Sequence, residues 1–332
     1  MKNHLKNVIV FAIFVTIAFG LSGCGGGGSS ATPPPPPTVT PATLGTVKEI
    51  KTPTSNFLWL STTDNNSMIG INSNLEVQAD SITGGSIPGS VYTFDVACFV
   101  NYSVCPSGVA KSATPTLTNF KYLASYYEGG VRYMYGLNTS TGAIVWLSSS
   151  DLITWTAVTS VSGLVVPAGT VKSVNVGLLN GSYTMSIEVA GASSSTIYFA
   201  TGATPTAFTI SAGSSFTATG NAHTPSMFYA GGYYYLMYST LAGTTPVTVT
   251  AIARSTNLAT WTQSPLFPAQ VPFAPYMAPN YDEGGYDKNV SAVEVGGKVY
   301  FTYMHGYTPA PSNYAGMATY NGTLAQYAAL FF

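Results

Sequence analysis

The chain has 332 residues, of which 7% are charged, with 11 Lys and Arg against 12 Asp and Glu. A typical soluble domain carries about 25% charged residues, and a chain with so few cations lacks the basic surface that binds nucleic acid. The 46% hydrophobic and 13% aromatic content excludes a disordered chain, and 3 cysteines in 332 residues exclude a small domain built on disulfides.

Residues 1–23 have the pattern of an export signal. Lys2 and Lys6 precede an apolar run, 8–20, that is shorter than the ~20 residues of a membrane-spanning helix. The signal ends in Leu-Ser-Gly-Cys, which resembles the lipobox of bacterial lipoproteins and implies cleavage before Cys24 and lipidation of Cys24. An ordinary signal peptide with a chance cysteine is the alternative. We therefore expect a protein of the bacterial cell envelope, in the outer membrane or at the cell surface, that contacts the membrane only through this lipid.

A tether and a folded domain are expected after the signal. Residues 24–47 contain four consecutive glycines and five consecutive prolines, which favour a flexible and then a polyproline II segment. The folded domain is expected over residues 48–332. Within it, Cys98 and Cys105 lie in a strand-like run that folds back on itself, which in an exported protein favours a disulfide; two unpaired buried thiols are the alternative. No His lies nearby, so no metal site is expected there.

Beyond the tether, the pattern predicts strands only. Short runs rich in Val, Ile, Thr, Tyr and Phe are separated by Gly, Asn, Ser and Pro, and no segment has convincing helical periodicity. Turn pairs recur at Gly129, Asn180, Gly231 and Gly296, which indicates a repeat of about 51 to 53 residues with four strands each. Such a repeat predicts an all-β, five-bladed β-propeller. Residues 83–118 fit the repeat poorly, so they form either an insertion or a shortened blade that makes six.

Two of the repeats contain a Ser-x-x-Leu-x-x-Trp segment, which ends at Trp155 and at Trp261. We expect Asp151 and Asn257 within these segments to cap turns between outer strands, as short Asx side chains do. The two tryptophans are expected to pack between blades.

Parts of the chain resemble the five-bladed glycoside hydrolases of the arabinanase and β-xylosidase group. Residues 149–156 read Ser-Ser-Asp-Leu-Ile-Thr-Trp-Thr and are similar to the Ser-x-Asp-Leu-x-x-Trp blade motif of that group. Residues 223–236 resemble its His-Ala-Pro-Asp-Val-x-Tyr segment, which is followed by Gly-x-Tyr-Tyr-Leu. The resemblance covers residues 120–305 and implies a propeller whose innermost strands present carboxylates to a glycan in the central channel.

The positions at which the resemblance implies carboxylates are not acidic. Ser226 occupies the place of the Asp that tunes the pKa of the acid, and the repeat puts Ala124, Asn175 and Ser291 at the equivalent places. Glycoside hydrolysis needs two carboxyl groups that face one sugar. The sequence therefore favours a propeller that binds without catalysis.

The acidic residues left for chemistry gather in residues 280–289. If the protein is catalytic, we expect Asp287 to act as base and Glu283 as acid; a solvated turn-forming loop and a calcium-holding loop are the alternatives. No other cofactor is expected. His223 precedes an innermost strand and, as the resemblance implies, can point into the channel to contact a sugar; a structural or solvent-facing His is the alternative.

The scarcity of charged residues also favours an uncharged ligand. Tyr276, Tyr281 and Tyr286 offer aromatic faces and hydroxyls of the kind that contact neutral sugars, although tyrosines also serve ordinary β packing. Three functions follow: a surface-anchored propeller that binds a neutral glycan or another extracellular polymer without catalysis, a glycoside hydrolase that acts on a plant-type glycan or an exopolysaccharide, and a structural or adhesion protein of the envelope.

Overall fold

A computed structural model describes the chain at residues 48–49, 59–60, 68–71, 76–81, 90–95, 109–111, 119–151, 154–192, 194–218, 222–242, 247–267, 286–307 and 312–332. Residues Thr40–Phe332 form one compact unit, and Met1–Val39 form a second unit outside these residues. Cys24, Cys98 and Cys105 also lie outside the described residues, so the lipid anchor and the disulfide stay predictions.

Hydrogen bonds join the described strands into four sheets. Three sheets have four antiparallel strands each, namely β3 (Met68–Ile71), β4 (Glu76–Ser81), β5 (Ser90–Asp95) and β6 (Val109–Lys111); β7 (Phe120–Glu128), β8 (Val131–Asn138), β9 (Ile144–Ser149) and β10 (Thr159–Ser160); and β11 (Thr170–Leu179), β12 (Ser182–Ala190), β13 (Ser195–Thr204) and β14 (Ala207–Phe216). The fourth has nine strands, namely β1 (Lys48–Glu49), β2 (Trp59–Leu60), β15 (His223–Ala230), β16 (Tyr233–Ala242), β17 (Val247–Ser255), β18 (Thr262–Gln263), β19 (Tyr286–Val295), β20 (Lys298–Tyr307) and β21 (Ser312–Asn321).

The sequence predicted five or six blades, and this number is corrected to four sheets among the described strands. The described strands form four sheets because a single parallel pair, Thr248 with Tyr286, joins the β15–β18 group to the β19–β21 group. Residues 83–118 do not form a sheet of their own among the described strands. They supply β5 and β6, the outer strands of the first sheet.

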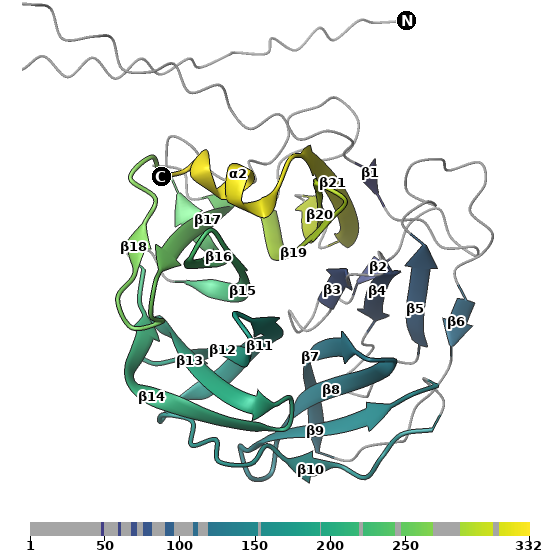
Figure 1. Ribbon diagram of the computed structural model, residues 1–332. Coiled ribbons are helices and arrows are strands. Elements are labelled where there is room, and N and C mark those ends of the chain that lie inside the picture. The colour runs from purple at the N-terminus through teal and green to yellow at the C-terminus, as the bar shows by residue number, and fades with distance from the viewer. Residues whose placement is uncertain are drawn as a thin grey trace, which may run out of the picture. The chain divides into compact units, whose positions relative to one another are not determined.

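The sheets are arranged as a propeller, as the repeat predicted. Strands β3, β7, β11, β15 and β19 lie innermost, and each of them contacts the next around a common centre (Figure 1). The later strands of each group lie progressively farther from this centre, so each sheet packs its faces against its neighbours. One core cluster, for example, joins Leu123 and Tyr135 of the second sheet to Val174 and Ile187 of the third.

The predicted tight turns connect each of four innermost strands to its second strand. At the β7–β8 turn, Gly129 and Gly130 have φ of 58° and 81°, and at the β11–β12 turn, Asn180 and Gly181 have φ of 51° and 75°. Two-residue hairpin turns require positive φ at both central residues, which is why glycine and asparagine recur there. The repeat read from the sequence is therefore confirmed at these turns.

The side chains expected to cap outer turns do so. Asp151 Oδ1 accepts from the backbone N–H of Thr154 at 2.7 Å, and Asn257 Oδ1 accepts from Thr260 N–H at 2.9 Å. The ring of Trp261 lies 4.7 Å from that of Phe199 in the neighbouring sheet, which confirms packing between sheets. Among the described side chains, Trp155 instead packs against its own sheet, on Phe120, Met134, Val145 and Leu147.

The sequence predicted no helix, and this prediction is wrong at the C-terminal end of the described chain. A short helix, α2 (Leu324–Ala329), follows β21 and begins with a capping box between Thr323 and Gln326. Its Tyr327 and Ala328 are fully buried against the last sheet. No helix among the described residues is long and apolar enough to cross a membrane.

The two ends of the folded unit meet in one sheet. Lys48 of β1 pairs with Met317 of β21, and Trp59 of β2 pairs with Tyr314 of the same strand. The last sheet is thus completed by strands from the beginning of the domain.

Candidate functional site

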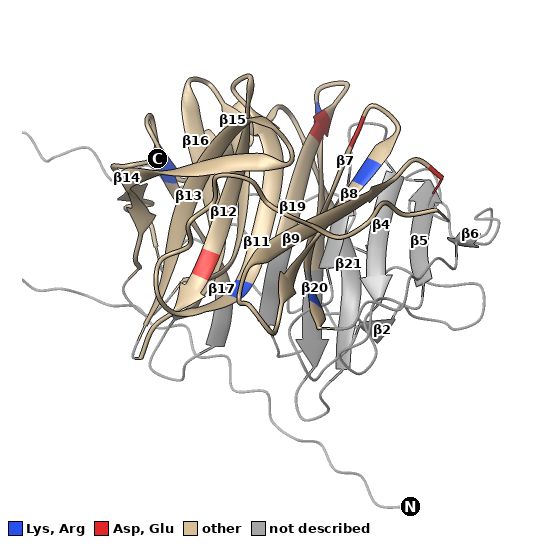
Figure 2. Cartoon of the chain, turned by 90° about the horizontal axis from the view of Figure 1, so that it is seen from below, with Lys and Arg blue, Asp and Glu red and all other residues tan. Residues whose placement is uncertain are grey.

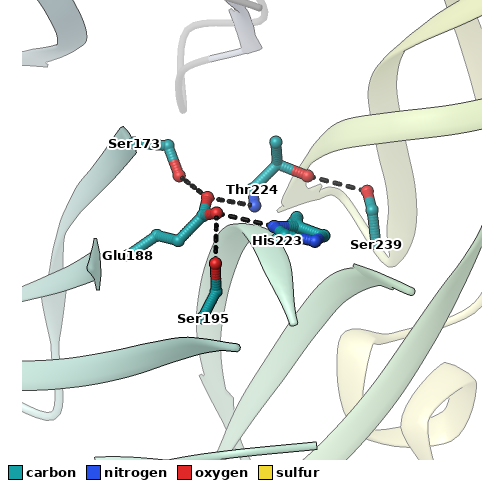
Figure 3. Close-up of polar contacts among 6 residues, drawn as sticks. All are labelled: Ser173, Glu188, Ser195, His223, Thr224 and Ser239. Atoms are coloured by element: carbon teal, nitrogen blue, oxygen red, sulfur yellow. Dashed lines mark hydrogen bonds and ion pairs between the residues drawn. The ribbon is translucent and has the colours of Figure 1, made fainter. Parts of the chain in front are cut away.

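A buried carboxylate on the second strand of the third sheet organises a cluster of polar side chains (Figure 3). Glu188 of β12 is 3% exposed and lies where β11 begins, paired with Ser173. One oxygen, Oε2, accepts from Ser173 Oγ at 2.6 Å and from Thr224 N–H at 3.0 Å. The other, Oε1, accepts from Ser195 Oγ at 3.2 Å and lies 2.6 Å from His223 Nδ1. Four donors therefore share the two oxygens, and the carboxylate is fully satisfied.

The bonds to Glu188 decide its protonation. Burial acts to raise the pKa of the carboxyl, but the bonds from His223, Ser173 and the Thr224 backbone outweigh it and hold the pKa below its ordinary value of 4.5. Glu188 is therefore ionised near neutral pH. An ionised carboxylate is only an acceptor, so Glu188 has no proton to give to a substrate.

A backbone irregularity presents His223 to this carboxylate. His223 is the first residue of β15, and the register of β15 against β16 shifts between His223 and Ser226. Thr224 lies in this bulge with φ of 48°, and its Oγ1 is 2.7 Å from Ser239 Oγ. Bulges re-aim side chains at sheet edges and beside functional sites. Here the bulge directs both the imidazole and a backbone N–H toward Glu188.

The arrangement sets the tautomer of His223. Because Glu188 can only accept, Nδ1 must carry the proton of the shared hydrogen bond, and in a neutral ring Nε2 then bears the lone pair. The His223 side chain is 45% exposed, whereas that of Glu188 is 4% exposed. The cluster is thus a fixed imidazole with a buried anchor and a solvent-accessible face, which can accept a hydrogen bond from a ligand hydroxyl.

The four positions that the resemblance assigned to carboxylates are structurally equivalent and carry none. Ala124, Asn175, Ser226 and Ser291 each pair with the fifth residue of the second strand of their sheet. Asn175 has a structural partner, since its Oδ1 accepts from Met227 N–H of the neighbouring innermost strand at 3.3 Å. The repeat thus aligned these positions correctly.

The other residues proposed from the sequence are only partly described. Asp287 and Tyr286 lie in β19, where the backbone of Asp287 pairs with His305, but only their backbones are described. Glu283, Tyr276 and Tyr281 lie outside the described residues, so their roles stay predictions. Sequence reasoning missed Glu188; the available signal was an acidic residue between the apolar Ile187 and Val189 in an otherwise uncharged strand, where a buried carboxylate needs a partner.

Metal binding finds no support among the described side chains. In that part of the chain, no three His, Cys, Asp or Glu residues gather in a way that could hold an ion. Of the loop considered for calcium, residues 280–289, residues 280–285 lie outside the described residues, and only the backbone of residues 286–289 is described.

The radial sheets define a β-propeller, and the polar cluster around Glu188 lies beside its innermost strands. No protein-family model and no curated protein sequence matches the chain. Among solved structures, an endo-1,4-β-xylanase from Bacteroides thetaiotaomicron has a TM-score of 0.55 and 11% identity, over 78% of this chain and 89% of that one. An endo-arabinase from the same organism has a TM-score of 0.54 and 11% identity, over 81% and 99% of the two chains. A xylan β-1,4-xylosidase from Bacillus halodurans has a TM-score of 0.51 and 12% identity, over 76% of this chain but only 52% of the xylosidase. At these identities the similarity is one of fold.

Proposed function

We propose that this propeller binds carbohydrate at the end where its innermost strands begin, and that it does not hydrolyse it. We call this the strand-start end, and the opposite end, with the tight turns, the turn end. One observation carries the proposal: the four equivalent innermost positions lack a carboxyl group, and the buried carboxylate beside them, Glu188, is held ionised by four donors. Hydrolysis by the usual route needs one carboxylic acid that donates a proton and a second carboxylate.

Within this proposal, His223 contacts the ligand. Its Nδ1 is committed to Glu188, which leaves Nε2 to accept a hydrogen bond from a sugar hydroxyl. The glycosidase-like fold and the solved arabinanase and xylanase structures that share it support carbohydrate as the ligand class.

The test is a pair of measurements on the same protein. Calorimetry against soluble arabinan and xylan is expected to show binding, while a reducing-sugar assay over the same polymers shows no release above the buffer control. His223→Asn is the matched variant, because the Asn side-chain N–H takes the place of Nδ1–H on Glu188 but leaves nothing in the place of Nε2. We expect it to fold normally and bind about tenfold more weakly, because the loss of one hydrogen bond worth about 1.4 kcal/mol has this effect. Steady release of reducing sugar that survives in His223→Asn would refute the non-catalytic function.

A second function is favoured by the position of Asp287. The backbone of Asp287 lies near the beginning of innermost strand β19, at the same end as His223. This placement supports the alternative of a glycoside hydrolase with Asp287 as base and Glu283 as acid. Asp287→Asn separates the two functions, since it would abolish hydrolysis in an enzyme and leave carbohydrate binding by a non-catalytic propeller intact.

We further propose that the domain is held in the bacterial envelope by a lipid on Cys24, with residues 24–47 as tether. The Leu-Ser-Gly-Cys segment supports this location. Mass spectrometry of the membrane-extracted protein is expected to find acyl chains on Cys24, and a Cys24→Ala variant is expected in the soluble fraction. An adhesion role would instead appear as a protein partner that co-purifies after mild detergent extraction.

A further inference from the structure

We propose that the carbohydrate bound at the strand-start end is acidic, that is, a polysaccharide with carboxylate groups on its sugar rings. This inference rests on the proposed function and narrows its ligand class. The low overall charge led us to expect a neutral glycan, but the distribution of the few charges within the propeller indicates otherwise.

Basic residues recur at one place in successive innermost strands. Lys121 in β7, Lys172 in β11 and His223 in β15 each lie eight residues before the first residue of the tight turn that ends their strand, and Lys288 holds the same place in β19. Lys121 and His223 both pair with the seventh residue of the second strand, whereas Lys172 is the bulged residue next to Ser173. Since β7, β11 and β15 are neighbours around the centre, the fold brings these residues to one end (Figure 1).

Lys121 and Lys172 have no acidic partner among the described side chains. Lys121 is half-buried and Lys172 is exposed, and neither forms an ion pair within the part of the chain that the structure describes. Glu188, the acidic side chain described at this end, is buried and already satisfied by its four donors, including Nδ1–H of His223. The ammonium groups are therefore available to a negatively charged ligand.

The other described acidic side chains lie at the turn end. Glu128 is the last residue of β7, and it accepts from the Tyr183 hydroxyl at 2.5 Å, a bond that with burial raises the pKa of Tyr183 to about 12. Glu294 accepts from Leu324 N–H at 2.8 Å, and Asp151 lies two residues after Ser149, the last residue of β9. Figure 2 shows how few coloured segments interrupt the tan ribbon. The acidic side chains at the turn end thus share it with Arg132, Arg254 and Lys298, whereas Lys121 and Lys172 lie at the strand-start end.

The direct test compares two forms of one polymer. Polygalacturonate carries a carboxylate on each ring, and its methyl ester has the same rings without the charge. Binding of the full chain is measured by calorimetry at low salt and at 0.5 M NaCl. We expect about tenfold tighter binding of the acid form at low salt, and loss of this preference at high salt, because salt screens exposed charges.

The variants assign the preference to residues. Lys121→Gln/Lys172→Gln is expected to lose the tenfold preference and still bind the ester as the wild type does, which also shows that it is folded. Lys298→Gln is the matched control, since Lys298 lies at the turn end with its ammonium 5.3 Å from the Tyr300 ring centre. It is expected to keep the preference.

Every other result of these binding measurements refutes one specific claim. Equal binding of acid and ester by the wild type refutes the acidic ligand and leaves the proposed function standing; it is the result expected if Asp287, whose backbone lies at this end, offsets the lysines. An acid preference that survives in the double variant refutes the assignment to Lys121 and Lys172. Failure to bind either form, together with arabinan and xylan, refutes carbohydrate binding itself.

Discussion

Replacement of Glu188 by Gln tests the central contact of the candidate site. Gln has the shape of Glu but offers one acceptor oxygen and one donor NH2 group. Thr224 N–H can only donate, so the amide oxygen must face Thr224 and Ser173, and the NH2 group must then face Ser195 and His223. The serine hydroxyl can rotate to accept. His223 must change tautomer, which moves the ring proton from Nδ1 to Nε2.

The size of the effect follows from the four bonds. Bonds to a charged group are each worth about 1.5–3 kcal/mol and neutral bonds about 0.5–1.5 kcal/mol, but the variant no longer buries a charge. We expect Glu188→Gln to lower the free energy of unfolding by about 2 kcal/mol at pH 7. Glu188→Ala leaves the donors without an acceptor and should cost about 4 kcal/mol.

The lowered pKa of Glu188 also determines how the stability difference between wild type and Glu188→Gln changes with pH. A carboxyl whose pKa is lower in the folded than in the unfolded state stabilises the fold above its ordinary value of 4.5, and this contribution is lost as pH falls through the folded value. The difference between wild type and Glu188→Gln should therefore be largest near neutral pH and shrink below about pH 4.5.

Urea unfolding followed by tryptophan fluorescence measures both effects, and ligand titration reports the tautomer. The variant should bind carbohydrate differently from the wild type, because Nε2 of His223 now donates instead of accepting. If Glu188→Gln is as stable as the wild type at pH 7, or if the difference between them grows on acidification, the assignment of an ionised, fourfold-bonded Glu188 is wrong.

The remaining predictions concern the scaffold. Trp261→Ala should lower the free energy of unfolding by about 3–5 kcal/mol by opening a cavity against Phe199, measurable by urea unfolding. Gly129→Ala should cost only about 1 kcal/mol, since its Cβ would meet nothing within 4 Å and the strain is limited to its φ of 58°. Gly202→Ala should instead prevent normal folding, because its Cβ would lie 1.8 Å from the backbone oxygen of Ala207; thermal scans of the two glycine variants side by side would contradict this reasoning if their losses were equal.

The repeat could be predicted because its signals are local. Asn180-Gly181 and Gly231-Gly232 reveal hairpin turns through a requirement of the backbone itself, and the spacing between them reveals the repeated unit. The count of separate sheets could not be predicted in the same way. It depends on one parallel pair, Thr248 with Tyr286, between residues that lie far apart in the sequence.

The candidate site was less accessible to sequence reasoning. His223 could be singled out because the chain has only 3 histidines and this one lies where an innermost strand was expected to begin. Its partner Glu188, however, lies 35 residues earlier and on another sheet. Only the packing of the third sheet against β15 brings the two together. The bulge that orients them has Thr224 at positive φ, and neither of the residues that usually adopt this conformation, glycine or asparagine, marks it in the sequence.

The pairing of β1 and β2 with β21 closes the ring of sheets. Because a protein emerges N-terminus first, Lys48–Glu49 must wait without its partner until Met317 has been made, nearly the whole domain later. Contacts so distant in sequence form slowly. A chain of which only the first part has been made therefore cannot close its ring, and we expect this seam to form late in folding.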